Sequence, residues 1–213
     1  MLDVLYENLN EFRKDITNNL NINVINKKEK ECGVNFPKAM NIFYSYFGND
    51  KRVLTSYYEF DEIEDIRIEN NALTFGYNHQ GNGRLGIVLE KLNGKFQSIS
   101  WYSYERKTWF SEGAVFPESF FFNIACWQVL NTMSSIVKTH ISQTEFEKLV
   151  SKYFCYFSNE KLYLKGYNVV SIYSNDILGC YVKDDEELYL GTQKDDETLE
   201  KCIKKLNIDF DWL

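Results

Sequence analysis

The stretch FFFNIACWQVL, residues 120–130, is apolar on nearly every side of a helix. Pro117 stands just before it, and proline is favoured in the first turn of a helix because the N–H group it lacks has no partner there anyway. A helix without a polar face must be covered on all sides. We therefore predict a long buried helix from Pro117 to Val137 that lies across a sheet as the centre of the fold.

Three further helices are predicted before this segment. The first has apolar residues at three- and four-residue steps, namely Leu2, Leu5, Leu9, Phe12 and Ile16. The second runs from Asn26, with Glu29 as its capping-box partner, to Gly33. Pro37 opens the third helix, Gly48 stops it, and its apolar face consists of Ala39, Met40, Phe43, Tyr44 and Phe47.

The pattern then changes to a two-residue period, which is typical of strands. Four strands are predicted, at residues 53–60, 71–77, 84–90 and 95–102. Asn82-Gly83 and Asn93-Gly94 lie between them, and Asn-Gly is a strong hairpin signal because both central residues of the favoured turn need positive φ. The predicted fold is thus α+β, with helices packed on a mainly antiparallel twisted sheet.

A C-terminal strand-and-helix extension is predicted after this domain. Ser142 and Glu145 form a capping box before an amphipathic helix. Short strands follow at residues 161–167, 168–174, 177–183 and 187–192, and a last helix at residues 196–206. No linker composition separates the parts. We therefore expect a domain at residues 1–138 and an acidic α+β extension at residues 139–213 that packs on it.

Composition excludes several classes of protein. Hydrophobic residues make up 44% of the 213 residues, which is too high for a disordered chain. The net charge of -7 disfavours nucleic acid as a partner. The first residues lack the pattern of a secretory signal and no segment is long and apolar enough to span a membrane, so we expect a cytoplasmic protein without a membrane partner. The five scattered cysteines predict reduced thiols.

Catalytic, cofactor and metal motifs are weak. Gly81-Asn82-Gly83 lacks the third glycine or the lysine of a phosphate-binding loop, and a predicted strand follows it. His79 and His140 lie far apart in the sequence, and no nucleophile motif accompanies either. The acidic segments 60–69, 183–187 and 194–200 lack the spacing of a calcium loop. We therefore predict no enzyme, no cofactor and no bound metal.

The aromatic segment WYSYERKTWF, residues 101–110, is more informative. Trp101, Tyr102, Tyr104 and Trp109 cannot all point into the core from a strand, because successive side chains alternate between its faces. Exposed tryptophan and tyrosine are common anchors of protein interfaces. The alternative is that both faces of this part of the sheet are buried.

Three segments resemble the SUKH superfamily, which includes fungal cell-wall-synthesis regulators of the Smi/Knr type and many bacterial immunity proteins. ECGVNFPKAMNIFYSYFGN (31–49) resembles the opening helix of the family. ENNALTFGYNHQGNGRLGIVLE (69–90) is similar to its central hairpin. TWF and FPESFFFNIA (116–125) resemble the entry to its closing helix. The resemblance covers residues 25–138 and implies a non-enzymatic α+β scaffold that binds other proteins.

The primary hypothesis is accordingly an immunity protein that binds and neutralises a cognate toxin domain, with a basic toxin fitting the negative charge. The expected partner-binding residues are those of the hairpin tip and the aromatic segment, namely Tyr77, Asn78, His79, Gln80, Trp101, Tyr102, Tyr104 and Trp109. One alternative is a regulatory scaffold of the cell-wall-regulator type without a toxin partner. Another is a hydrolase that uses His79. The sequence leaves the oligomeric state open.

Overall fold

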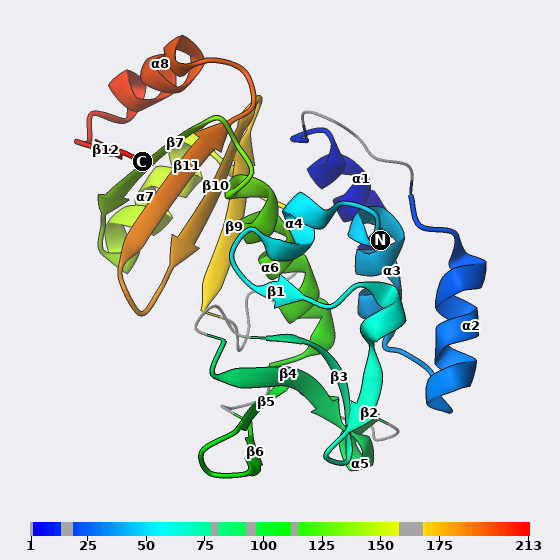
Figure 1. The fold of residues 1–213 in the computed structure, drawn as a ribbon. Coiled ribbons are helices and arrows are strands. Elements are labelled where there is room, and N and C mark those ends of the chain that lie inside the picture. Colours follow the sequence, from blue (N-terminus) through cyan, green and yellow to red (C-terminus); the bar gives the residue numbers. More distant parts are fainter. Residues whose placement is uncertain (1, 14–18, 78–80, 93–96, 112–114, 158–167) are drawn as a thin grey trace.

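The computed structural model describes residues 2–13, 19–77, 81–92, 97–111, 115–157 and 168–213. Within these ranges the protein is a mixed α+β structure with eight α-helices, a short 3-10 helix and two antiparallel sheets (Figure 1). The mixed α+β class predicted from the sequence is confirmed. The strands of the described residues form two sheets, where the sequence predicted one sheet and an extension.

The first sheet contains six strands in the order β1-β3-β4-β5-β6, with β2 paired to β3 as well. These strands are β1 (Glu59–Phe60), β2 (Arg67–Glu69), β3 (Ala72–Tyr77), β4 (Gly83–Val88), β5 (Ser100–Ser103) and β6 (Thr108–Phe110). Four helices precede it: α1 (Leu2–Asn10), α2 (Ile22–Cys32), α3 (Lys38–Phe47) and α4 (Lys51–Thr55). The 3-10 helix Ile63–Asp65 and α5 (Leu89–Leu92) complete this part of the chain.

The second sheet has the order β12-β7-β11-β10-β9-β8. Its strands are β7 (Ser135–His140), β8 (Cys155–Tyr156), β9 (Val169–Ser174), β10 (Ile177–Val182), β11 (Glu187–Thr192) and β12 (Asp211–Trp212). The helices α7 (Gln143–Tyr153) and α8 (Asp196–Leu206) pack on one of its faces through a core of their own. Asn207 ends α8 in the left-handed conformation, and the predicted Ser142–Glu145 capping box is present at the start of α7.

The helix α6 (Pro117–Leu130) lies between the two sheets (Figure 1). Every residue of α6 except Glu118 is buried, as the all-round apolar pattern predicts. Its phenylalanines pack on Phe75 of β3, and the same core includes Leu178 and Cys180 of β10. The predicted domain division at residue 138 falls within β7 and stays a prediction.

The buried Gln128 side chain of α6 is hydrogen-bonded through both its oxygen and its nitrogen. The Gln128 side-chain amide donates hydrogen bonds to the carbonyls of Val53 (2.7 Å) and Tyr58 (2.8 Å), and its oxygen accepts from the N–H groups of Tyr57 and Tyr58 (3.0 Å each). A buried polar group is costly unless it is hydrogen-bonded. Gln128 therefore fixes the α4–β1 segment on the central helix.

Several predicted boundaries are wrong, each for a local reason. Residues 53–60 form α4 and β1 because Asp50 caps the helix, its carboxylate accepting from the N–H groups of Arg52 (3.1 Å) and Val53 (3.4 Å). The helix α6 ends at Leu130, and residues 135–140 form β7, whose alternate residues face the two cores. An alternating apolar pattern over only eight residues does not reliably predict a strand when a helix-capping residue such as Asp50 precedes it.

The predicted strand 84–90 ends at Val88, because Leu89–Leu92 form α5, and the predicted strand 161–167 lies outside the described residues. Further differences lie near the N-terminus. The helix α1 ends at Asn10, and Ile16 lies outside the described residues. The helix α2 begins earlier than predicted, with Asn21 as its cap. The Glu29 carboxylate accepts from the Phe36 N–H at 2.6 Å and so supports the approach to α3. Gly33 ends α2 with a φ of 69°, as predicted.

Candidate partner-binding surface

A row of directly opposite residues crosses the first sheet on the face turned away from α6. Paired residues on neighbouring strands project to the same side of a sheet. The register therefore places on one face Glu59 of β1, Tyr77 of β3, Arg84 of β4, Tyr102 of β5 and Trp109 of β6. We call these five residues the cross-strand row. Leu85 and Ile87 of β4 alternate with Arg84 and point into the core with α6.

Arg84 is the centre of the cross-strand row and is only 1% exposed. Its two terminal nitrogens donate to the Asp61 carboxylate at 3.0 Å and 2.6 Å, and one of them also donates to Thr74 Oγ1 at 2.9 Å. Its guanidinium carbon lies 4.3 Å from the centre of the Tyr77 ring. The Glu69 carboxylate is farther away, with 3.8 Å between its Oε2 and Arg84 Nε.

The charge state of Arg84 is secured by these contacts. Burial acts to lower the pKa of the guanidinium, but the hydrogen bonds and the charge of Asp61 outweigh it and raise the pKa above its usual value. The bidentate geometry also fixes the plane of the guanidinium. Arg84 is therefore a permanent, rigid cation against the face of the Tyr77 ring.

The aromatic rings of the surface contact one another. The centre of the Tyr102 ring lies 5.3 Å from that of Trp109 and 5.9 Å from that of Tyr104. Trp109 Nε1 donates to the Asn70 carbonyl at 2.7 Å, which extends the indole across the sheet to the β2–β3 turn. Tyr104 is 45% exposed, while Tyr102 and Trp109 are half-buried. Partial burial, then the neighbouring Tyr77, raises the pKa of Tyr104, which favours its neutral hydroxyl.

The Trp109 indole packs directly against the backbone of Gly86 in β4. A methyl group at this position would lie 2.8 Å from the indole and 2.8 Å from the Leu73 carbonyl oxygen. Both distances are too short for a carbon atom, and one of the neighbours is backbone. Only glycine therefore allows the indole to lie flat on this strand.

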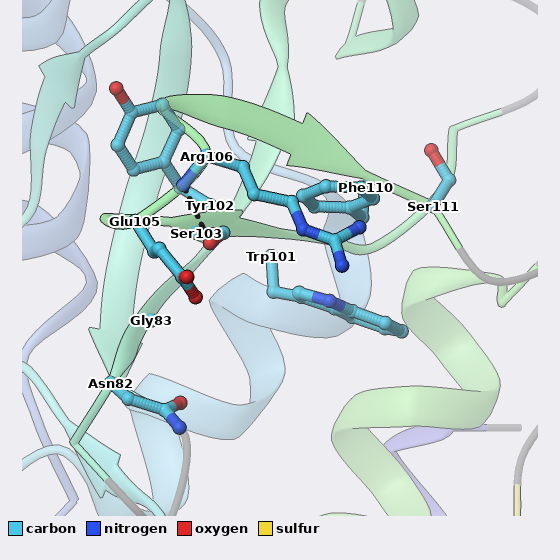
Figure 2. Close-up of a pocket in the computed structure, with 9 residues that line it drawn as sticks. All are labelled: Asn82, Gly83, Trp101, Tyr102, Ser103, Glu105, Arg106, Phe110 and Ser111. Carbon is cyan, nitrogen blue, oxygen red and sulfur yellow. Dashed lines mark hydrogen bonds between the residues drawn. The ribbon is translucent and has the colours of Figure 1, made fainter.

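Trp101 lies on the opposite face of the same sheet, where it packs against the large core. It borders a hollow of about 450 Å³ at the end of the β5–β6 hairpin, shown in Figure 2. The Arg106 guanidinium lies over the Phe110 ring in this hollow, at 5.5 Å from the ring centre. Of the aromatic residues predicted from the sequence, Tyr77, Tyr102, Tyr104 and Trp109 are thus brought together, and Trp101 is separated from them by the sheet.

The other predicted residues, Asn78, His79 and Gln80, lie outside the described residues. The strands on either side of them, β3 and β4, pair antiparallel, so the predicted hairpin is confirmed. Its left-handed residue within the described chain is Gly81, with a φ of 65°, and Gly83 already belongs to β4. The predicted turn with Asn82-Gly83 at its centre is therefore wrong, because Gly83 is a strand residue.

Reactive groups elsewhere do not converge in the described part of the chain. His140 on β7 is exposed, and its Nε2 lies 3.4 Å from Glu187 Oε1. The described residues contain no group of three or more side chains placed to hold a metal ion. They also contain no helix that is long and apolar enough to cross a membrane. Among the described residues, the cross-strand row with Tyr104 is therefore the strongest candidate site. Its aromatic rings can stack on a partner, and its tyrosine hydroxyls can donate hydrogen bonds.

Arg84 and Asp61 are functional candidates that the sequence does not single out. A usable signal exists, because Arg84 is the one charged residue among the apolar and glycine positions 83–88. A charge within a buried strand requires a partner. The identity of that partner depends on the fold, since Asp61 lies 23 positions earlier in the chain.

Comparison with family models, with curated proteins and with solved structures finds no match to this chain.

Proposed function

We propose that the protein is a non-enzymatic binding module whose partner docks on the cross-strand row and Tyr104. The single observation that carries this proposal is the cluster of four aromatic side chains on one sheet face, in which the Tyr102 ring contacts the rings of both Tyr104 and Trp109. Tyrosine and tryptophan supply large contact areas with few rotatable bonds and are enriched among the residues that dominate binding energy. The face opposite the core is where such side chains remain accessible.

Charge supports a basic partner. The chain carries a net charge of -7, and exposed carboxylates such as Glu59 flank the aromatic cluster. The positive charge of Arg84 is neutralised by Asp61, so it does not oppose a cation above the rings. Aromatic faces attract cationic side chains, and complementary charge speeds association. A partner with exposed lysine or arginine therefore fits this surface best.

We further propose that this partner is a toxin domain and that binding neutralises it in the cytoplasm, as expected for a SUKH-like immunity protein. The resemblance of residues 25–138 to that superfamily and the hairpin that carries its central segment support the proposal. In this mechanism the chain performs no chemistry. It occupies a basic active site or substrate groove and excludes the substrate of the toxin.

The test begins with co-expression of the chain and the toxic protein domains encoded near its gene. Protection of the cells and a stable complex on affinity capture would support the proposal. A stable complex with a non-toxic partner would favour the regulatory scaffold instead. Lack of any complex and lack of protection would refute binding of such a toxin.

The surface itself is tested with substitutions. Tyr104→Ala and Trp109→Ala should each weaken binding by about 2–4 kcal/mol, the range of interface anchors. Trp212→Ala is the matched control, because this tryptophan is 48% exposed on the edge strand β12 of the other sheet. It should leave the affinity unchanged. Equal affinities for all three variants and the unmodified chain would refute binding of the partner at this surface.

A further inference from the structure

A second hollow, of about 350 Å³, lies on the second sheet between the helices α7 and α8 and the β9–β10 turn. Both helices pack on the face of that sheet turned away from α6 (Figure 1). The buried side chains of Phe154, Ile177 and Leu206 line it, together with the thiol-bearing Cys202. The hollow therefore has an apolar part at the level of the core.

The rim of the hollow is basic. Lys152 borders it from the end of α7, and Lys201 and Lys205 border it from α8. The two α8 lysines are four residues apart and so share one face of the helix. Tyr153, Ser174 and Thr198 add hydroxyl groups to the lining. A concentration of ammonium groups is unusual in a chain with a net charge of -7.

The lysines of this region differ in their pairing. Lys201 lies 2.8 Å from Glu197, Lys204 lies 3.2 Å from Glu200, and Lys194 lies 2.6 Å from Asp176, the one acid in the lining of the hollow. By contrast, neither Lys152 nor Lys205 has a carboxylate within ion-pair distance among the described residues. Both residues line the same hollow, where Lys152 Nζ lies 4.8 Å from the centre of the Tyr153 ring, and no acidic side chain of the described residues forms an ion pair with either lysine.

We propose that this hollow binds an organic phosphate of about nucleotide size. The ammonium groups of Lys152 and Lys205 hold the phosphate, for which lysine is a common point-charge ligand. The apolar side chains at the base of the hollow contact the organic part, and the volume lies within the usual range for small-molecule sites. The site lies on the second sheet and is independent of the proposed docking of a partner on the first sheet.

Isothermal titration calorimetry at low ionic strength tests this proposal with three probes, ADP, pyrophosphate and adenosine. ADP is expected to bind saturably at one site, adenosine not measurably, and pyrophosphate more weakly than ADP. Pyrophosphate binding as tight as that of ADP would assign the site to free phosphates and retain the role of the lysines. Failure of both phosphates to bind, or adenosine binding as tight as that of ADP, would overturn the proposal.

Two sets of variants locate the site. The double variant Lys152→Gln/Lys205→Gln should bind ADP at least about tenfold more weakly, because each substitution removes one charged hydrogen-bond donor. Lys204→Gln is the control, because it makes the same type of substitution at the residue next to Lys205 on α8, which is paired with Glu200. It should keep the affinity within about twofold, because Lys204 does not line the hollow and its charge is already paired with Glu200. An unchanged affinity of the double variant, or an equal loss in Lys204→Gln, would overturn the proposal.

Discussion

Removal of the Asp61 carboxylate should destabilise the protein far more than its position near the surface suggests. Asp61→Ala leaves Arg84 with its full positive charge, only 1% exposed and without the two hydrogen bonds of 3.0 Å and 2.6 Å to the carboxylate. The guanidinium does not lose its proton in this variant, because the intrinsic pKa of arginine lies far above neutral pH. Breaking a buried pair in this way costs about 3–5 kcal/mol in the free energy of unfolding.

The loss should be partly recovered when both partners are removed. In the double variant Asp61→Ala/Arg84→Met, no buried charge is left unpaired, and apolar replacements of buried ion pairs are often neutral. The two substitutions are therefore expected to be non-additive, with a coupling of about 2 kcal/mol or more in a double-mutant cycle. Thr74 Oγ1 keeps a partner in either variant, because it also donates to the Arg67 carbonyl at 3.0 Å.

Urea unfolding followed by tryptophan fluorescence measures these free energies. Arg67→Met is the control, because the Arg67–Glu69 pair lies on the same sheet but is half exposed, with 3.0 Å between its charged atoms. An exposed pair contributes about 1 kcal/mol or less. A loss below about 1 kcal/mol for Asp61→Ala, or strictly additive effects of the two substitutions, would refute the role given to this pair.

Two further outcomes are expected from the same unfolding assay. Gln128→Leu should cost about 3 kcal/mol, because it leaves the N–H groups of Tyr57 and Tyr58 and the Val53 carbonyl without their partner, and a loss under about 1 kcal/mol would contradict this. The pH dependence should reflect Asp50: burial acts to raise its pKa, but Arg13 and then Arg52 outweigh this and lower it. Its stabilisation is therefore complete above the unfolded-state pKa of about 3.9 and is lost as the pH falls through the lower folded value. The difference in unfolding free energy between the unmodified chain and Asp50→Asn should stay constant from about pH 7 to 5 and shrink below about pH 4, and a constant difference down to about pH 2 would contradict the assignment.

The sequence predicts well those features that depend on a single stretch of chain. The apolar surround of α6, the capping box at Ser142 and the left-handed Gly33 are local patterns, and the structure has all three. The alternation argument also predicts correctly that the aromatic residues of the segment 101–110 divide between two faces. Local chemistry is sufficient for these features because the relevant partners lie within a few residues.

The cross-strand row could not be predicted in the same way, because it depends on the register of five strands. The register of β3 against β4 shifts between Thr74 and Gly76, which changes the residues that oppose one another beyond that point. Gly76 permits the approach of β1, since a methyl group there would lie 2.7 Å from the Glu59 carbonyl oxygen. Neither the register shift between β3 and β4 nor the close approach of β1 to Gly76 leaves a periodic signal in the sequence. Both are needed to place Tyr77 beside Arg84.

The way the aromatic rings are held favours this face as the binding surface over other exposed aromatic positions. Trp109 is fixed by its hydrogen bond to Asn70 and by the close fit to Gly86, and Tyr77 is fixed by the guanidinium of Arg84. A side chain that is already ordered loses less conformational entropy when a partner binds, so more of its contact energy appears as affinity. Trp212 is more exposed than Trp109 and makes no ring contact with the described residues, so it would lose more freedom on binding. Buried charge and close packing beneath the surface thus determine which aromatic residues can serve as rigid anchors.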